Sequence, residues 1–324
     1  MSNSQNQLSK PIFPVFLASL LSIHGLRKKS LSPGGAATAF VVGLLMMAGG
    51  VKVFGVSLCV FYLTGSRATK CEYLGKKQKS QFEDGYHEAV LSNSFAAFIA
   101  CVLWNVIFVP GSLQAFLVSL LSLDLSDILA DALKLKANEI PVYGDGGSWC
   151  PIDQSVANGW SRALILASLG HFACCLGDTL ASELGILSRS KPILITTLKP
   201  VPPGTNGGVS AFGVFASLAG GAIMGLTAGA CLILESSKCR ESWMEILLSM
   251  IWWGTVGGGT GSLVDSLLGA TVQQTKFSEN KKLILQDESP LTGPIKVISG
   301  INVLTNNQVN VVSSIFTCLW ISLL

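Results

Sequence analysis

Long apolar stretches alternate with short polar segments along most of this chain. An α-helix needs about 20 predominantly apolar residues to cross a bilayer, within a range of about 17–25. Eight stretches meet or approach that length, the first and third being short: 12–26, 34–50, 52–66, 89–109, 161–181, 209–234, 245–269 and 308–324. The pattern predicts an all-α fold, in which one integral membrane domain, 1–324, forms a polytopic transmembrane bundle of seven or eight spans.

Composition supports a membrane protein and excludes other classes. Of the 324 residues, 49% are hydrophobic and 13% are charged, whereas about 25% of the residues in a soluble domain are charged. The small net charge of +3 indicates no nucleic-acid partner. Most of the nine cysteines lie in apolar stretches and none forms a CxxC pair, which is typical of small packing residues rather than metal ligands.

Basic residues are concentrated in alternate loops. The loops 27–33, 67–88, 188–208 and 271–307 hold fifteen of the 22 Lys and Arg residues. Because cytoplasmic loops carry an excess of basic residues, we predict that these four loops are cytoplasmic. The orientation is the same for the last five spans even if one short N-terminal span is miscounted.

The segment 110–160 is predicted to be a non-cytoplasmic insertion. Within 113–136, leucines recur every four residues and aspartates occupy another face, a pattern that predicts an amphipathic helix in the membrane interface. Residues 138–160 are rich in Gly and Pro and are predicted to form a loop. If this side faces a lumen, Cys150 and Cys239 could form a disulfide.

Two acidic residues, Asp178 and Asp265, lie at the predicted cytoplasmic ends of apolar stretches. A carboxylate near hydrocarbon costs roughly 2.5–3.5 kcal/mol on insertion scales, so it is kept where it meets water, a cation or a partner. Asp178 continues a stripe of small residues at four-residue spacing, and Asp265 lies beside another. Such stripes allow helix backbones to pack closely in lipid. We therefore predict a glycine-rich, close-packed bundle.

The same stripes predict that the two carboxylates converge in one cytoplasmic pocket. Asp178 and Asp265, with Ser182 on the same stretch as Asp178, are therefore candidate functional residues. The alternative is that each acid caps a helix or pairs with Lys or Arg.

A glycine-rich loop, Pro202 to Ser210, precedes the stretch 209–234 on the predicted cytoplasmic side. Its backbone N–H groups and the following helix N-terminus could bind phosphate, although no Walker A or GxGxxG pattern is present. The alternative is a tight turn with Ser210 as the helix cap. The candidate phosphate-binding or substrate-binding residues of the loop are Gly204, Thr205, Asn206, Gly207 and Gly208.

Other polar residues on this side could complete the site. Lys199 precedes the glycine-rich loop, Arg67 and Lys70 follow the stretch 52–66, and Asn307 and Asn310 lie near the start of the last stretch. The alternative for each basic residue is that it only orients the chain in the membrane.

Several motifs, taken together, closely resemble the transmembrane protein 19 family, also described as the integral membrane DUF92 family, from about residue 26 to the end. They are Gly177-Asp178-Thr179, Ala181-Ser182-Glu183, Gly185, Ile195-Thr196-Thr197, the run from Pro203 to Ser210, Asp265-Ser266, Gly269-Ala270-Thr271, Asn306-Asn307 and Val309-Asn310. Two segments depart from the family pattern. Asn93-Ser94-Phe95 stands where the family usually has Asn-Gly-Gly, and 110–160 is unlike the shorter connection of the family.

The family includes the plant phytyl-phosphate kinases, and the resemblance implies a membrane enzyme that phosphorylates a prenyl monophosphate. Asp178, Asp265 and Ser182 would then be catalytic residues, and the two acids would hold Mg²⁺, which prefers oxygen donors. The glycine-rich loop would bind phosphates of the nucleotide or of a phytyl-like or geranylgeranyl-like acceptor. Arg67, Lys70 and Lys199 would offset negative charge. We expect an endomembrane location rather than the plasma membrane.

Two other function classes remain open. Buried acids and glycine-rich segments also fit a transporter or flippase of an anionic lipid or solute. The third possibility is a non-catalytic membrane protein. The sequence leaves open the nucleotide donor, the length of the prenyl chain and the oligomeric state.

Overall fold

The computed structural model describes residues 12–28, 30–75, 90–120, 140–144, 149–185, 187–188, 190–280, 282–285 and 293–324, with 69–75 as backbone only. Each of the eight predicted apolar stretches falls largely within one helix. These helices are α2 (Ile12–Arg27), α3 (Pro33–Met47), α4 (Val53–Gly75), α6 (Phe95–Phe108), α9 (Trp160–Gly185), α10 (Ala211–Glu235), α12 (Trp243–Thr271) and α13 (Asn306–Ser322).

Some of these helices are long and apolar enough to cross a membrane. Within the described residues, Val156–Gly185 and Ala211–Glu235 are each long and apolar enough to cross. Phe95–Phe108 and Leu113–Leu120 (α7) make a third span if the bent pair counts as one. α12 is 29 residues long but rich in glycine, which lowers its hydropathy. The total of seven or eight spans stays a prediction.

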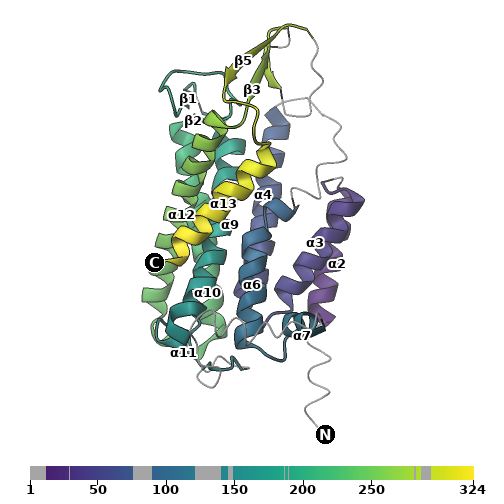
Figure 1. Cartoon of the computed structure of the whole chain (residues 1–324), viewed down its shortest axis with the longest axis vertical. Coiled ribbons are helices and arrows are strands. Elements are labelled where there is room, and N and C mark those ends of the chain that lie inside the picture. The colour runs from purple at the N-terminus through teal and green to yellow at the C-terminus, as the bar shows by residue number, and fades with distance from the viewer. Residues whose placement is uncertain are drawn as a thin grey trace.

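The expectation of an all-α fold is wrong in the loops. β1 (Ile193–Leu194) pairs with β2 (Gly208–Val209), and a separate three-stranded antiparallel sheet has the order β4-β3-β5. Its strands are β3 (Thr275–Ser278), β4 (Leu283–Leu285) and β5 (Ile295–Ser299), all within the predicted loop 271–307. Figure 1 shows both sheets at one end of the helices and α7 at the other.

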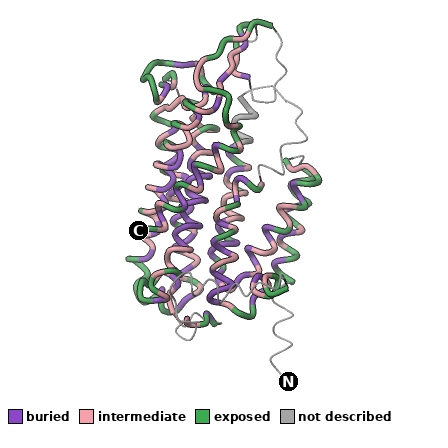
Figure 2. Tube along the Cα trace, in the orientation of Figure 1, coloured by how far each residue is buried: buried purple, intermediate pink, exposed green. Residues whose placement is uncertain are grey.

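Helix α9 lies at the centre of the bundle and contacts α4, α6, α10, α12 and α13. Its middle is almost continuously buried, from Ile165 to Gly177 (Figure 2). Apolar side chains surround it on several sides, as where Phe172 of α9 meets Phe61 of α4 with ring centroids 5.8 Å apart. A helix buried on most faces is apolar around its whole circumference, which explains why its few polar residues stand out.

Glycines bring three of these helices into backbone contact. A Cβ on Gly177 of α9 would lie 2.8 Å from the Gly258 carbonyl oxygen of α12, and one on Gly258 would lie 2.6 Å from the Ser217 oxygen of α10. One on Gly221 of α10 would overlap the Gly254 carbonyl. Only residues without a side chain permit this approach, so the glycines fix where α9, α10 and α12 meet.

The end of the bundle opposite the sheets is held by a disulfide and an aromatic cluster. Cys150 is bonded to Cys239 of α11 (Ser237–Glu241), the pairing that the sequence allowed if this side faces a lumen. The Trp104 indole donates to the Ser161 hydroxyl at 2.9 Å and lies beside Trp149. These contacts connect the segment before α9 to α6 and α11.

The predicted insertion 110–160 is only partly described. α7 covers the first eight residues of the predicted amphipathic helix 113–136 and is bent by 90° from α6. The remainder of that helix lies outside the described residues. Residues 140–144 and 149–155 have no regular secondary structure, as the predicted loop requires, and a short 3-10 turn (Val156–Gly159) leads into α9.

Candidate functional site

A cavity of about 190 Å³ lies at the end of the bundle that carries the sheets. Its walls come from the ends of α9, α10 and α12, from the β1–β2 connection and from the start of α13. Both acids singled out from the sequence line this cavity, as does Ser182. Residues distant in sequence therefore meet here because the central helices all end at this level.

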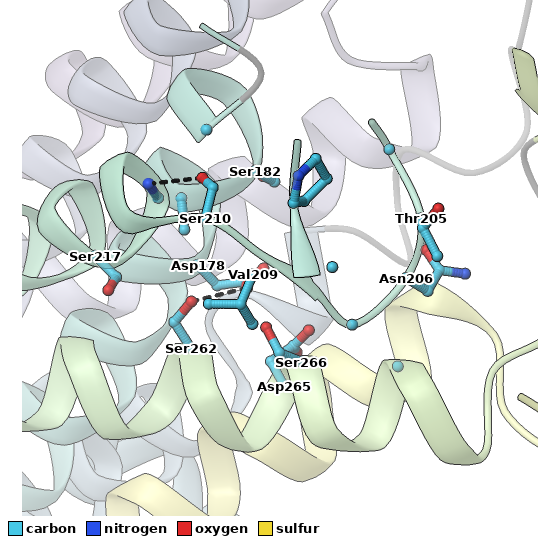
Figure 3. A pocket seen from close by; sticks show the side chains of 18 of the residues that line it. Asp178, Ser182, Thr205, Asn206, Val209, Ser210, Ser217, Ser262, Asp265 and Ser266 are labelled. Atoms are coloured by element: carbon cyan, nitrogen blue, oxygen red, sulfur yellow. Dashed lines mark hydrogen bonds between the residues drawn. The ribbon is translucent and has the colours of Figure 1, made fainter. Parts of the chain in front are cut away.

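Asp178 projects from α9 toward α12, as Figure 3 shows. Its Oδ1 accepts a hydrogen bond of 3.4 Å from the Ser262 hydroxyl of α12. Ser182, one turn further along α9, is exposed at the rim, and its hydroxyl donates to the Thr179 carbonyl at 3.0 Å. Both residues thus line the cavity, Asp178 with its carboxylate bonded across to α12 and Ser182 at an exposed position.

Asp265 of α12 lies on the same cavity and is held by α13. Its Oδ2 accepts a hydrogen bond of 2.8 Å from the Ser313 hydroxyl. The Asn310 amide lies 3.2 Å from the same oxygen, and its nitrogen donates when the amide is oriented to satisfy both of its atoms. Asp178 also lies close enough to Asp265 for the two carboxylates to interact electrostatically.

The glycine-rich loop forms one wall of this cavity, from Pro203 to Ser210. Gly204 and Gly207 have positive φ angles of 85° and 77°, which glycine adopts without strain. Gly207 is pressed against α12, since a Cβ there would lie 2.5 Å from the Ser266 carbonyl oxygen. The Asn206 N–H donates to the Thr275 hydroxyl of β3 at 3.1 Å. The loop is therefore attached to α12 and to the three-stranded sheet.

Part of the hydrogen-bonding capacity of this loop is used within the chain. The Thr205 hydroxyl donates to the Pro202 carbonyl at 2.6 Å, and the Gly208 N–H donates to the Thr205 carbonyl at 2.9 Å. Ser210 caps α10 by accepting a hydrogen bond from the Gly213 N–H at 3.1 Å. The tight turn with a Ser210 cap, one of the two sequence alternatives, is what the geometry contains. Phosphate binding by the loop stays a prediction.

Basic residues expected at the site are absent from the described wall of the cavity. Arg67 is exposed on α4 and its guanidinium donates to the Leu63 carbonyl of its own helix at 3.4 Å. Lys199 is exposed in the β1–β2 connection and does not line the cavity. The Lys70 side chain lies outside the described part of the chain. The structure does not bring Arg67 or Lys199 into the cavity wall, because a loop's side of the membrane does not fix where its side chains point, and their role in neutralising charge stays a prediction.

The asparagines at the start of α13 divide into two groups. Asn310 contacts Asp265, and Asn306 lines the cavity. Asn307 is partly buried but does not line it. The Thr305 hydroxyl accepts from the Gln308 N–H, and the Gln308 side chain accepts from the Thr305 N–H, a capping box that fixes the start of the helix. The capping box therefore fixes where Asn310 lies along the axis of α13.

The oxygen-bearing side chains of the cavity suit a hard divalent cation whose remaining coordination positions are taken by water or substrate. Among the described residues, no group of three or more His, Cys, Asp and Glu side chains is placed to hold a metal ion. Asp178 and Asp265 supply carboxylate oxygens, and Ser262 and Ser266 supply hydroxyls on the same cavity. Mg²⁺ is commonly bound by one or two carboxylates together with waters and substrate phosphates, so these residues suit it.

Sequence reasoning missed the hydroxyls that orient the two acids. Ser262 belongs to the small-residue stripe of α12, and Ser313 lies one helical turn after Asn310 on α13. The i, i+3 spacing of Asn310 and Ser313 was a usable signal, since it puts two polar groups on one face of an apolar helix.

Residues 16–318 match the sequence model of a family described as integral membrane protein DUF92. The chain belongs to this family. It is 33% identical over 306 residues to Protein PGR of Arabidopsis thaliana, covering 94% of this chain and 93% of that protein. An uncharacterized membrane protein of Methanocaldococcus jannaschii is 35% identical over 127 residues, which cover 39% of this chain and 48% of that protein.

Another relative is an uncharacterized membrane protein of Synechocystis, 33% identical over 117 residues, which cover 35% of this chain and 40% of that protein. No solved structure gives a significant match. The family resemblance inferred from the motifs is thus confirmed, and with it the assignment to an integral membrane protein. The names of these relatives do not specify a reaction, so activity rests on the chemistry of the cavity.

Proposed function

We propose that this protein is a membrane-embedded kinase that transfers a phosphoryl group from a nucleotide, CTP or ATP, to a prenyl monophosphate such as a phytyl or geranylgeranyl phosphate. The observation that carries the proposal is the meeting of Asp178 and Asp265, from two different helices, in one cavity beneath a glycine-rich turn. Two carboxylates brought together at the edge of the membrane are costly unless a cation or protons offset their charge. A cation-dependent reaction explains why the pair is present.

Mg²⁺ bound by Asp178 and Asp265 would supply the positive charge that neutralises phosphate oxygens during phosphoryl transfer. This role matters more here because no described residue lining the cavity is Lys or Arg. The carboxylates are oriented by Ser262 and Ser313. The chain would thus hold its metal-binding groups in place before the substrates arrive, which limits the entropy lost in reaching a reactive geometry.

The reaction itself asks little covalent chemistry of the protein. An oxygen of the acceptor monophosphate forms a bond to the terminal phosphorus of the nucleotide, and the bond between that phosphorus and its bridging oxygen breaks. A prenyl diphosphate and a shortened nucleotide result, and the ionised acceptor has no proton to lose. Positioning and charge neutralisation dominate such a transfer. Asp178, Asp265 and the hydroxyl of Ser182 at the rim are the residues we place nearest to it.

We further infer that the helices span the membrane seven or eight times with glycine-mediated packing, and that the cavity opens to the cytoplasmic side of an endomembrane. The concentration of Lys and Arg in the loops at this end supports the orientation. The disulfide at the other end supports it as well, since disulfides persist in oxidising compartments.

The experiment uses purified full-length protein, labelled CTP or ATP, and geranylgeranyl or phytyl monophosphate. We expect Mg²⁺-dependent formation of the diphosphate, with losses of at least a hundredfold in Asp178→Asn and Asp265→Asn. Asp153→Asn is the matched control, because Asp153 lies near the disulfide and, among the described residues, its side chain accepts hydrogen bonds from Ser155 of its own turn. Absence of product with every acceptor and Mg²⁺ concentration would overturn the proposal. Solute or lipid flux in liposomes without nucleotide would favour a transporter instead.

A further inference from the structure

The cavity wall contains apolar residues that a purely aqueous phosphate site does not need, among them a valine and a leucine on two neighbouring helices. Val214 of α10 and Leu263 of α12 line it together with the polar groups. Leu263 is also 41% exposed, and it lies one turn before Leu267 on α12, which is 48% exposed. A residue that both lines a cavity and faces outward marks a place where the cavity approaches the surface. On a membrane-spanning helix that surface faces lipid.

The contacts between α10 and α12 define the lower limit of this opening. A Cβ on Gly259 would lie 2.7 Å from Cδ2 of Leu218, and one on Gly258 would lie 2.6 Å from the Ser217 carbonyl oxygen. The two helices are therefore in direct contact from this level toward the disulfide end. One turn nearer the sheets, at Val214 and Leu263, the cavity occupies the space between them.

The depth of the cavity is suited to a lipid headgroup. Asp178 lies seven residues before the end of α9, which corresponds to about 10 Å along the helix. A bilayer is about 40–45 Å thick with its headgroups and has a hydrocarbon core of about 30 Å. With the end of α9 at the outer surface of the headgroups, the carboxylates of the cavity would lie near the boundary between headgroups and hydrocarbon. The neighbouring exposed residues are apolar, Phe215 being 67% exposed and Leu267 48%.

We propose that the apolar chain of the phosphorylated substrate enters sideways from the bilayer between α10 and α12, and that Val214 and Leu263 are the residues that receive it. The acceptor is then a lipid monophosphate that keeps its chain in the membrane while its phosphate reaches Asp178 and Asp265. This inference rests on the proposed function and adds the route and the residues that select for chain length.

Leu263→Trp tests the route by narrowing the opening. With Mg²⁺ and nucleotide, we expect transfer to a 20-carbon prenyl monophosphate to fall at least tenfold. Transfer to a five-carbon monophosphate supplied from water should fall less, so that the ratio of the two rates changes at least fivefold. Leu248→Trp is the matched control, since Leu248 is an exposed residue of the same helix that does not line the cavity. Equal effects on both acceptors, or no effect on either, would overturn the proposed entry of the substrate chain between α10 and α12 while leaving the kinase proposal intact.

Photo-crosslinking provides a readout that does not depend on turnover. A 20-carbon prenyl monophosphate with a photoreactive group on its chain is irradiated with the parent protein and with Leu263→Ala, a milder variant that tests the site if the Trp variant does not fold. Labelling of peptides containing Val214 or Leu263 supports entry of the chain between α10 and α12. Labelling confined to other helices contradicts it. A protein that transfers phosphate to neither acceptor would refute the proposed function, whereas the crosslinks would still locate the chain.

Discussion

The Ser313 hydroxyl donates a hydrogen bond of 2.8 Å to Oδ2 of Asp265, so α13 orients a carboxylate that belongs to α12. Removing an oriented partner of a metal-binding carboxylate commonly lowers metal affinity or activity by about 10–100-fold. Ser313 is 1% exposed, and its hydroxyl also lies 3.2 Å from the Asn310 carbonyl oxygen of its own helix. It is therefore a positioning residue of the proposed site.

Ser313→Ala should reduce phosphoryl transfer by about tenfold and raise the Mg²⁺ concentration needed for half-maximal activity. The measurement is the Mg²⁺ dependence of transfer by the purified variant. Ser314→Ala is the control, because that buried hydroxyl donates to the Val311 carbonyl of its own helix. If both variants keep the parent Mg²⁺ dependence, the orienting role of Ser313 is disproved. Recovery in Ser313→Thr would confirm that the hydroxyl is the relevant group.

Gly207→Ala should destabilise the protein more than Gly204→Ala. Both glycines have positive φ, which costs a residue with a side chain roughly 1–2 kcal/mol. Only at Gly207 would the added Cβ also meet the backbone of α12, at the Ser266 carbonyl; at Gly204 the nearest atom is 3.9 Å away. Thermal unfolding in detergent measures the difference. Equal melting temperatures for the two variants would show that the loop does not rest on α12.

Gly221→Ala should disrupt the contact between α10 and α12. The new Cβ would overlap the Gly254 carbonyl, and backbone cannot move aside as a side chain can. Gly43→Ala is the control, since its Cβ would make only an ordinary contact of 3.6 Å with Met47. We expect a lower melting temperature or loss of monodisperse protein for the first variant alone. Wild-type behaviour of Gly221→Ala in size-exclusion chromatography and thermal unfolding would contradict the packing described here.

The helices could be predicted because most of the apolar stretches are long and are separated from one another by Gly, Pro or charged residues. The sheet β4-β3-β5 could not, since its strands have three to five residues and are stabilised by one another rather than by a local pattern. The stretch 245–269, which forms most of α12, was predicted from its apolar residues, and its stripe of small residues predicted close packing. Local sequence therefore determined the helices, while contacts between distant segments determined the sheet.

The candidate site divides along the same line. The spacing of Asp178 and Asp265 relative to small residues predicted their shared cavity, because a packing face is also a buried face. The hydrogen bonds from Ser262 and Ser313 to the two acids were not predicted, since a serine in an apolar helix usually bonds to a carbonyl of its own preceding turn. Arg67 could not be placed, because a long side chain at a helix end has several directions available.

The bond between Cys150 and Cys239 predicts the redox environment of the end opposite the cavity. In membranes isolated under thiol-blocking conditions, maleimide-polyethylene glycol should label these two cysteines only after reduction. Comparing the parent with Cys150→Ser and Cys239→Ser assigns the labelled residues. Full labelling of both thiols without reductant would place this end in a reducing compartment and reverse the predicted orientation.

Binding of Mn²⁺, used as a spectroscopic substitute for Mg²⁺, tests most directly whether Asp178 and Asp265 form one cation site. Electron paramagnetic resonance on the full-length protein should detect one tightly bound ion. Asp178→Asn and Asp265→Asn should each weaken its affinity at least tenfold, the double variant should be little worse than either, and Asp153→Asn should bind as the parent does. Unchanged affinity in both single variants would contradict the account.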